Sequence, residues 1–316
     1  MGGVGGWLVT GGIVVLGGAG MLGHKLFQIL RERFPGTIAT TRENVHVPPL
    51  SGVTLLAGSD VLSGVDVLDF DALRTRLEKL APDVIVNCVG VIKQRDEAKR
   101  AIPSITLNAL FPHRLAEATG AWGGRVIHFS TDCVFSGRRG NYREEDASDA
   151  DDLYGRSKFL GEVATSNAIT LRTSIIGREL TEHRSLLDWF LSQKGRKVRG
   201  FRKVIYSGIT TNEMANVVSL IIRSFSTLSG LFQVVSEPIS KYDLLVLIRE
   251  TYGLEADIEP DDQDVSDRSM YGGKFHQATG WRAPSWPDMV RALAADPTPY
   301  EDWQGMVGPA DGRPAA

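Results

Sequence analysis

Short runs of β-branched and apolar residues alternate along the first half of the chain with longer segments in which apolar positions recur at helical spacing. This alternation is typical of βαβ units, which build a parallel sheet with helices on both faces. We predict strands at residues 13–16, 36–41, 83–87, 125–130 and 168–173. We predict helices between them at residues 21–34, 70–80, 104–119 and 154–168. The predicted fold class is therefore α/β, a Rossmann-type doubly wound parallel sheet.

Composition narrows the class of protein further. Hydrophobic residues make up 42% of the chain and charged residues 23%, as in soluble globular proteins. The net charge of −3 gives no cationic excess to attract a polyanion, so we expect no nucleic acid partner. Ten of the first 23 residues are glycine, which fits neither a membrane-spanning helix nor a signal peptide, and we expect no membrane association. Cys88 and Cys133 lie in apolar runs, as the reduced thiols of a cytoplasmic protein do, and the histidines show no metal-ligand spacing, so we expect no metal site.

A cluster of glycines follows the first predicted strand and opens the first predicted helix, at residues 17–23 (GGAGMLG). Two registers fit it, Gly18-x-Gly20-x-x-Gly23 and Gly17-x-x-Gly20-x-x-Gly23, and both suit a phosphate-binding turn. Glycines there allow a tight turn and close approach to a pyrophosphate, while the helix N-terminus offers N–H donors. The sequence therefore predicts a dinucleotide site that includes Gly17, Gly20, Met21, Leu22 and Gly23.

The end of the second predicted strand distinguishes between the two nicotinamide cofactors. An acidic residue there accepts the ribose hydroxyls of NAD, whereas a basic residue pairs with the 2′-phosphate of NADP. The strand ends Thr40-Thr41-Arg42-Glu43 and so offers both. Because Arg42 comes first, we favour NADP and expect NADPH to be preferred over NADH. Asp66 and Val67 follow the third strand-like run and are candidates for a place beside the adenine.

The alternation loosens after residue 177, which indicates a second and smaller domain. We divide the chain into a dinucleotide-binding domain of residues 1–177 and a substrate domain of residues 178–316. Residues 203–225 are expected to pack back on the first domain, and residues 1–11 to form a loose extension. The segment after residue 296 is rich in proline and glycine and poor in apolar residues, so we expect it to be a mobile tail.

A tyrosine and a lysine lie four residues apart in the last helix of the first domain, so Tyr154 and Lys158 share one face of it. An ammonium group close to a phenol favours the phenolate and lowers the phenol's pKa toward the range useful in acid–base catalysis. Thr131 ends a buried strand, where the carboxyl ends of sheet strands line a ligand crevice. We expect Thr131 to hydrogen-bond the substrate oxygen that Tyr154 protonates.

With these motifs the chain resembles the extended short-chain dehydrogenase/reductases, and within them the dTDP-4-dehydrorhamnose reductase branch. The resemblance spans residues 13–293 and includes the glycine turn. Four further segments carry it: residues 83–87 (DVIVN), 129–137 (FSTDCVFSG), 154–162 (YGRSKFLGE) and 171–177 (LRTSIIG).

The resemblance implies that Tyr154 is the general acid, that Lys158 binds the nicotinamide ribose and tunes Tyr154, and that Thr131 orients the substrate carbonyl. The implied reaction is the NAD(P)H-dependent reduction of the 4-keto group of a nucleotide-diphosphate-linked 6-deoxyhexose. Such reductions serve the biosynthesis of deoxysugars and cell-surface polysaccharides. Asn108 is either a family asparagine that supports a water relay or a helix-packing residue.

The chain departs from the reductase pattern at two places. The usual alanine run after the fourth-strand asparagine is replaced by Cys88, Val89 and Gly90, followed by residues 91–94, and the usual tyrosine after Ser-Thr-Asp is Cys133. In the family these positions lie near the cofactor and the sugar. The sugar, the carrier nucleotide and the product stereochemistry therefore stay open, and a UDP-linked sugar is an alternative to a dTDP-linked one.

Two other functions remain open at this point. One is a catalytically silent NADP-binding regulatory subunit of another enzyme, and the other is a nucleotide-sugar epimerase or dehydratase. The joint presence of Thr131, Tyr154 and Lys158 favours an enzyme, because a silent subunit has no need of them. The expected partner is a nucleotide-sugar substrate, and the sequence is also compatible with a homodimer.

Overall fold

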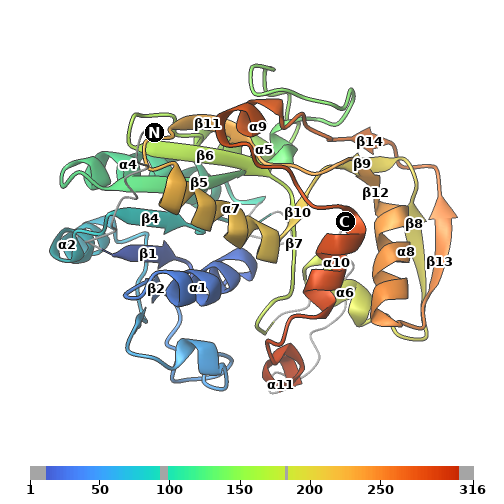
Figure 1. Cartoon of the computed structure of the whole chain (residues 1–316), viewed down its shortest axis with the longest axis horizontal. Helices are drawn as coiled ribbons and strands as arrows, with labels where there is room; N and C mark the ends of the chain where they lie inside the picture. The colour runs from blue at the N-terminus through green and yellow to red at the C-terminus, as the bar shows by residue number, and fades with distance from the viewer. Residues whose placement is uncertain (1–11, 93–98, 182–183, 306–316) are drawn as a thin grey trace, which may run out of the picture.

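A parallel sheet of seven strands lies at the centre of the computed structural model, which describes residues 12–92, 99–181 and 184–305 (Figure 1). The strand order is β11-β6-β5-β4-β1-β2-β3. The strands are β1 (Ile13–Leu16), β2 (Ile38–Thr40), β3 (Val61–Leu62), β4 (Val84–Asn87), β5 (Arg125–Thr131), β6 (Ala168–Thr173) and β11 (Gly230–Gln233). The chain winds outward in both directions from β1 and β4, which confirms the predicted α/β, Rossmann-type doubly wound sheet.

The two faces of the sheet carry different hydrophobic cores. Ile13 and Val15 of β1 belong to one core, and Val14 and Leu16 belong to the other. A strand that is buried on both faces needs an unbroken apolar run, which is why β1 reads IVVL. α1 and α7 pack together over the first face, and α2 and α4 cover the second (Figure 1). Their bounds are α1 (Met21–Arg33), α2 (Phe70–Leu80), α4 (Phe111–Gly120) and α7 (Thr211–Ser224).

The helix that contains Tyr154 and Lys158 is shorter than predicted. α5 (Leu153–Leu160) ends at Leu160, whereas the sequence predicts a helix to residue 168. A Cβ at position 161 would lie 1.9 Å from the main-chain oxygen of Asn108, so Gly161 lets the end of α5 touch the neighbouring helical segment. That segment consists of α3 (Ala101–Ser104), the π-helical turn η3 (Ile105–Leu110) and α4.

The remaining elements form three small sheets and a group of helices beside the central sheet (Figure 1). The sheets pair β10 with β7, β9 with both β12 and β14, and β13 with β8. These strands are β7 (Ile175–Ile176), β8 (Lys197–Phe201), β9 (Val204–Tyr206), β10 (Ile209–Thr210), β12 (Ile239–Ser240), β13 (Asp257–Asp261) and β14 (Ser266–Asp267). The helices are α6 (Leu186–Leu191), α8 (Lys241–Tyr252), α9 (Gly273–Thr279), α10 (Trp286–Ala294) and α11 (Tyr300–Gly305). The described residues also include the 3₁₀ turns η1 (Thr54–Leu56), between β2 and β3, and η4 (Asp132–Val134), after β5. Within the described ranges, no helix combines the length and the apolar character needed to cross a bilayer.

Elements from both sides of residue 177 build the part of the chain that contains the central sheet. β11 adds to the β6 edge of the central sheet. α7, which lies within residues 203–225, packs on α1. The central sheet is thus completed by a part of the chain that follows residue 177.

The tail expected after residue 296 is ordered as far as the structure describes it, which corrects that prediction. Residues 300–305 form α11, and Tyr300 and Trp303 are buried. Each of these aromatic side chains buries a large apolar area, which favours packing of this short segment against the rest of the chain. Residues 306–316 and the predicted extension at residues 1–11 lie outside the described residues.

Candidate active site

The predicted glycine turn joins β1 to α1. Gly17 has a φ of +82°, a conformation that favours glycine. A Cβ at Gly23 would lie 2.1 Å from the main-chain oxygen of Gly17, and a Cβ at Gly18 would lie 2.8 Å from the Cβ of Ala39. Side chains at these positions would clash, so the glycines allow α1 to approach β1 and β2 closely.

The first turn of α1 offers main-chain donors to an anion. Gly20 is the N-cap residue of this 13-residue helix, whose first turn contains no acidic residue and no side-chain cap. The N–H groups of Met21, Leu22 and Gly23 have no acceptor within the helix, and the helix dipole favours negative charge at the same end. These donors and the close-packed glycines fit the pyrophosphate of a dinucleotide.

The end of β2 lies against the glycine turn. Gly18 donates its N–H to the main-chain oxygen of Thr40 at 2.8 Å, so the residues after Thr40 start close to the predicted pyrophosphate site. Arg42 and Glu43 are both exposed, and Arg42 Nη2 lies 2.9 Å from Glu43 Oε1. The basic and the acidic candidates for the ribose position are therefore paired with each other.

Two further predicted segments lie on either side of this turn. Cys88 donates its N–H to the main-chain oxygen of Leu16 at 3.0 Å, and a Cβ at Gly90 would lie 4.0 Å from Lys158 Nζ. Residues 88–90, which follow β4, therefore lie between the end of β1 and Lys158. Val67 and Val89 pack against the same core of the sheet. Residues 93–94, part of the departure from the reductase pattern, lie outside the described residues.

Thr131 and Tyr154 meet where β5 ends and α5 begins. Asp152 caps α5 by accepting the N–H of Gly155 at 2.7 Å, and a Cβ at Gly155 would lie 2.1 Å from the main-chain oxygen of Cys133. Only glycine permits this close contact between the helix and the segment after β5. The contact places the Tyr154 side chain close enough to Thr131 for the threonine hydroxyl to lower the pKa of Tyr154.

The electrostatic environment of Tyr154 differs from the predicted one. The sequence predicts that Lys158 lowers the pKa of the phenol, but burial raises the pKa of Tyr154 above its ordinary value, and the neighbouring Thr131 only partly offsets this. Tyr154 is therefore a protonated hydroxyl in this structure, the form that a proton donor needs. Burial also lowers the pKa of Lys158 to about 8, with Glu162 and Cys88 acting in the opposite direction.

A buried ion pair that was not predicted supports the Lys158 end of α5. Arg172 of β6 donates from Nε and Nη2 to the two carboxylate oxygens of Glu162, each at 2.6 Å. Ser130 Oγ also donates to Glu162 Oε1 at 2.7 Å, so this carboxylate joins β5, β6 and the residues after α5. Glu162 lies two residues beyond the end of α5 and Arg172 lies in β6, so no helical spacing in the sequence could have revealed this pair.

Asn108 is held by structural hydrogen bonds. Its Oδ1 accepts the N–H of Val91 at 2.8 Å, and its Nδ2 donates to the main-chain oxygen of Val91 at 3.1 Å and to Ser157 Oγ at 3.2 Å. These bonds tie the π-helical turn η3 to the loop after β4 and to α5. Of the two roles left open for Asn108, the contacts match helix packing.

A second carboxylate, also missed by sequence reasoning, lies next to Thr131. Thr131 Oγ1 lies 3.1 Å from Asp132 Oδ1 and accepts the N–H of Cys133 at 3.1 Å. Burial raises the pKa of Asp132, while the guanidinium of Arg268 lowers it. Arg268 and Tyr206, both from the second half of the chain, interact electrostatically with Asp132. The Tyr206 hydroxyl has no hydrogen-bond partner among the described residues. No group of three or more metal-ligating side chains occurs in the described ranges.

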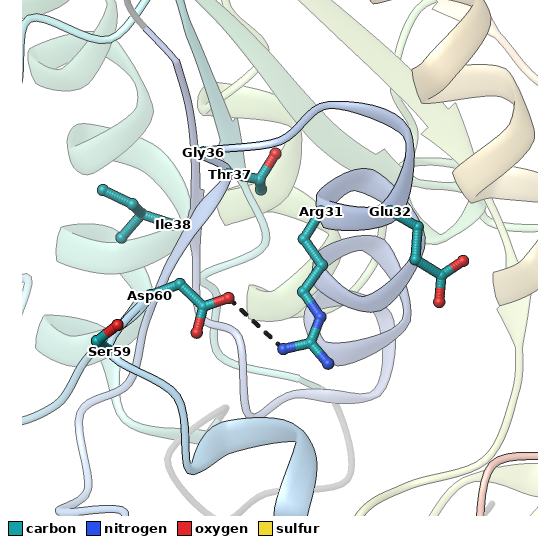
Figure 2. Close-up of a pocket in the computed structure, with 7 residues that line it drawn as sticks. All are labelled: Arg31, Glu32, Gly36, Thr37, Ile38, Ser59 and Asp60. Carbon is teal, nitrogen blue, oxygen red and sulfur yellow. Dashed lines mark ion pairs between the residues drawn. The ribbon is translucent and has the colours of Figure 1, made fainter.

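A surface hollow lies at the opposite end of β2 (Figure 2). It is lined by Arg31, Glu32, Gly36, Thr37, Ile38, Ser59 and Asp60, and Arg31 Nη1 lies 3.5 Å from Asp60 Oδ2 inside it. Because the sheet is parallel, the starts of β2 and β3 are on the far side from the glycine turn and Thr131. This hollow is therefore separate from the candidate active site.

Comparison with known proteins identifies the family. The model of the family described as the RmlD substrate binding domain matches residues 11–264. The chain belongs to this family. The resemblance to the dTDP-4-dehydrorhamnose reductase branch of the extended short-chain dehydrogenase/reductases is thereby confirmed.

The curated proteins similar to this chain have several different functions in their names. The Bacillus subtilis spore coat polysaccharide biosynthesis protein SpsK is 25% identical over 296 residues, which cover 88% of this chain and 95% of SpsK. A dTDP-4-dehydrorhamnose reductase from Streptomyces griseus is 30% identical over 159 residues, covering 50% of this chain and 44% of that protein. The methionine adenosyltransferase 2 subunit beta of Danio rerio is 36% identical over 97 residues, or 31% of this chain and 29% of that protein. The match thus spans nearly all of SpsK but less than half of the other two.

Similar solved structures share the fold. The Bacillus anthracis dTDP-4-dehydrorhamnose reductase in complex with NADP has a TM-score of 0.73 at 17% identity, covering 89% of this chain and 98% of that one. The Bordetella bronchiseptica enzyme WbmG in complex with NAD and UDP has a TM-score of 0.74 at 17% identity, covering 93% of this chain and 95% of that one. At these identities the likeness extends to the fold alone.

Proposed function

We propose that the chain reduces the 4-keto group of a nucleotide-diphosphate-linked 6-deoxyhexose, in the biosynthesis of a deoxysugar or cell-surface polysaccharide. The observation that carries this proposal is the placement of Tyr154 beside Thr131 at the carboxyl end of β5, with Lys158 one turn further along α5. Membership of the RmlD family and the names of SpsK and the Streptomyces griseus reductase support the choice of substrate.

The proposed roles follow from the chemistry of the three side chains. A bound nicotinamide cofactor supplies the hydride. Thr131 orients the substrate carbonyl, and Tyr154 gives its proton to the oxygen of that carbonyl as negative charge develops there. Lys158 binds the ribose next to the nicotinamide and stabilises the phenolate that Tyr154 becomes, because an ammonium group favours a nearby negative charge.

The proposed cofactor is NADP, with NADPH preferred over NADH. The glycine turn and the donors of Met21, Leu22 and Gly23 fit the pyrophosphate of either dinucleotide, so the preference rests on Arg42. Arg42 pairs with Glu43, but both side chains are exposed, and an exposed ion pair contributes only about 0–1 kcal/mol. A 2′-phosphate competes easily for the guanidinium, since bidentate contacts to phosphate are stronger. We place the activity in the cytoplasm, where the thiols of Cys88 and Cys133 stay reduced.

The test is a substrate panel. Purified protein is mixed with NADPH, or separately with NADH, and with dTDP-, UDP- and GDP-linked 4-keto-6-deoxyhexoses, while the absorbance of the reduced nicotinamide is followed. Oxidation with one sugar supports the reductase and identifies its carrier nucleotide. Tight cofactor binding without turnover of any sugar in the panel contradicts the proposal.

A catalytically silent regulatory subunit is the second candidate. It is favoured by the match to a protein named methionine adenosyltransferase 2 subunit beta, although this match covers only 31% of the chain. The two candidates differ in what they require of Tyr154. A regulatory subunit that binds NADP tolerates Tyr154→Phe without loss of any function, whereas the reductase loses its turnover.

We also propose that the chain forms a homodimer through α5 and the adjoining α3–η3 segment. Five exposed large apolar side chains gather on these elements: Ile102, Ile105, Leu110, Phe159 and Leu160. A twofold axis beside α5 would let each copy cover the same apolar surface of the other. Leu160→Glu is expected to give a monomer in light-scattering measurements, whereas Val265→Glu, at an exposed apolar residue outside this surface, is expected to leave the dimer intact.

A further inference from the structure

The segment after α10 packs on the helix that follows the glycine turn, although it lies outside the region matched by the family model. Lys25 of α1 is buried, and its Nζ lies 2.7 Å from Asp296 Oδ2 and 3.0 Å from Thr298 Oγ1. Asn212 Nδ2, at the start of α7, donates to the same Asp296 oxygen at 2.9 Å. Asp296 is thus a shared acceptor that anchors this segment to the two helices over one face of the sheet.

His24 connects this segment to the glycine turn itself. Its Nδ1 lies 2.9 Å from the main-chain oxygen of Gly20, and its Nε2 lies 2.9 Å from the Tyr300 hydroxyl. Burial lowers the pKa of His24 to about 4, so the ring is neutral near pH 7. A carbonyl can only accept, so Nδ1 carries the proton and Nε2 accepts the hydrogen of Tyr300. The chain of donors therefore runs from Tyr300 through His24 to Gly20.

Gly20 occupies a sensitive position in the turn. It is the N-cap residue of α1, its N–H is donated to the Gly17 oxygen at 3.0 Å, and its oxygen accepts both the main-chain N–H and the ring Nδ1–H of His24. The orientation of the peptide between Gly20 and Met21 depends on that oxygen. The same peptide carries the N–H of Met21, one of the donors proposed for the pyrophosphate.

The other side of Tyr300 contacts the substrate half of the chain. Arg178, which follows β7, lies with its guanidinium carbon 4.8 Å from the centre of the Tyr300 ring. The same guanidinium donates to Asp188 of α6 at 2.5 Å, to Glu301 at 2.9 Å and to Gln304 at 3.1 Å. α11 is thus fixed between α1 and α6.

We propose that Tyr300 and His24 are positioning residues that hold the Gly20–Met21 peptide for cofactor binding, and that residues 296–305 are coupled to the cofactor site through them. This inference rests on the proposed role of the glycine turn as the pyrophosphate site. Coupling of this kind is reciprocal: a segment that favours the bound cofactor must itself be stabilised when the cofactor binds.

Tyr300→Phe is the direct test, because it removes one hydroxyl and keeps the ring between Arg178 and α1. Loss of one hydrogen bond is expected to weaken NADPH binding, and to raise the KM for NADPH, by about 2- to 10-fold. The kcat at saturating NADPH and the KM for the sugar are expected to stay as in the wild type. The matched control is Tyr252→Phe, since the Tyr252 hydroxyl has no partner among the described residues.

A purely structural role would give a different result. In that case Tyr300→Phe lowers the melting temperature but leaves NADPH affinity unchanged, and this outcome overturns the inference. If the wild-type protein does not bind NADPH at all, both the inference and the proposed function are contradicted. Weaker NADPH binding by Tyr300→Phe in a protein that reduces no sugar would support the inference and contradict the reductase.

Hydrogen exchange on the wild-type protein tests the same coupling without any substitution. Saturating NADPH is expected to slow amide exchange in α11 as well as in the glycine turn. β13, in the small sheet with β8, serves as the internal control and is expected to exchange at the same rate with and without NADPH. Unchanged exchange in α11 would overturn the coupling.

Discussion

Lys158 Nζ donates a hydrogen bond to the main-chain oxygen of Phe129 at a distance of 2.5 Å. Phe129 lies two residues before Thr131 on β5, so this bond fixes the active-site helix to the strand that carries Thr131. The ammonium group is buried, and burial lowers its pKa to about 8. The charge on Lys158 therefore changes within the range of ordinary assays.

This pKa predicts the alkaline limb of the pH profile. Below about pH 8 Lys158 is charged, and above it the lysine is neutral. In the proposed mechanism only the charged form stabilises the phenolate of Tyr154. We expect kcat/KM for the keto sugar to fall as the pH rises through this value. The Lys158→Arg variant keeps its charge across the assay range, so its residual activity should lack this fall. If the variant and the wild type lose activity at the same pH, another group is responsible.

Tyr154→Phe tests the proton donor. The ring keeps its packing, but the proton that would reach the substrate oxygen is gone, so we expect kcat to drop by about 10²- to 10⁴-fold. NADPH affinity, measured by the fluorescence of the bound cofactor, is expected to stay within about twofold. Tyr252→Phe serves as the control and should retain full activity, because the Tyr252 hydroxyl has no hydrogen-bond partner among the described residues. Turnover of Tyr154→Phe at the wild-type rate would remove Tyr154 from the mechanism.

The cofactor preference is tested at two adjacent residues. Arg42→Ala is expected to raise the KM for NADPH by about 10- to 100-fold and to leave the KM for NADH nearly unchanged, because only NADPH carries the 2′-phosphate. Glu43→Ala removes the residue that pairs with Arg42, so it is expected to leave NADPH binding unchanged or to strengthen it. Initial rates with each cofactor give both values. An equal effect of Arg42→Ala on NADPH and NADH would contradict the preference.

The buried pair of Glu162 and Arg172 predicts a stability effect. Glu162→Gln leaves the Arg172 charge buried without its carboxylate, and breaking such a pair costs about 3–5 kcal/mol. The control is Glu259→Gln, which breaks an exposed pair with Lys197 and is expected to leave the free energy of unfolding nearly unchanged. Chemical denaturation gives the free energy of unfolding of each variant. Equal losses in the two variants would show that the buried pair has no special role.

Several features of this protein were predictable from local sequence. An unbroken apolar run predicts β1, and helical periodicity predicts α1. The glycine turn between them is predictable because only glycine fits the close contacts there. The four-residue spacing of Tyr154 and Lys158 predicted that both side chains share one face of α5, because this depends only on helix geometry. The end of α5 was not predictable, since it is set by the contact of Gly161 with the main chain of Asn108.

The amino-acid sequence by itself determined the fold class, because hydrophobic periodicity along the chain specifies the alternation of strands and helices. It also contained the motifs of the family resemblance and the candidate groups Thr131, Tyr154 and Lys158. The tertiary structure alone decided which distant residues act on them. Burial set the direction of the pKa shifts of Tyr154 and Lys158. The contact between His24 and Tyr300 spans 276 positions. Packing creates such relationships between segments that are far apart in sequence, and no local pattern encodes them.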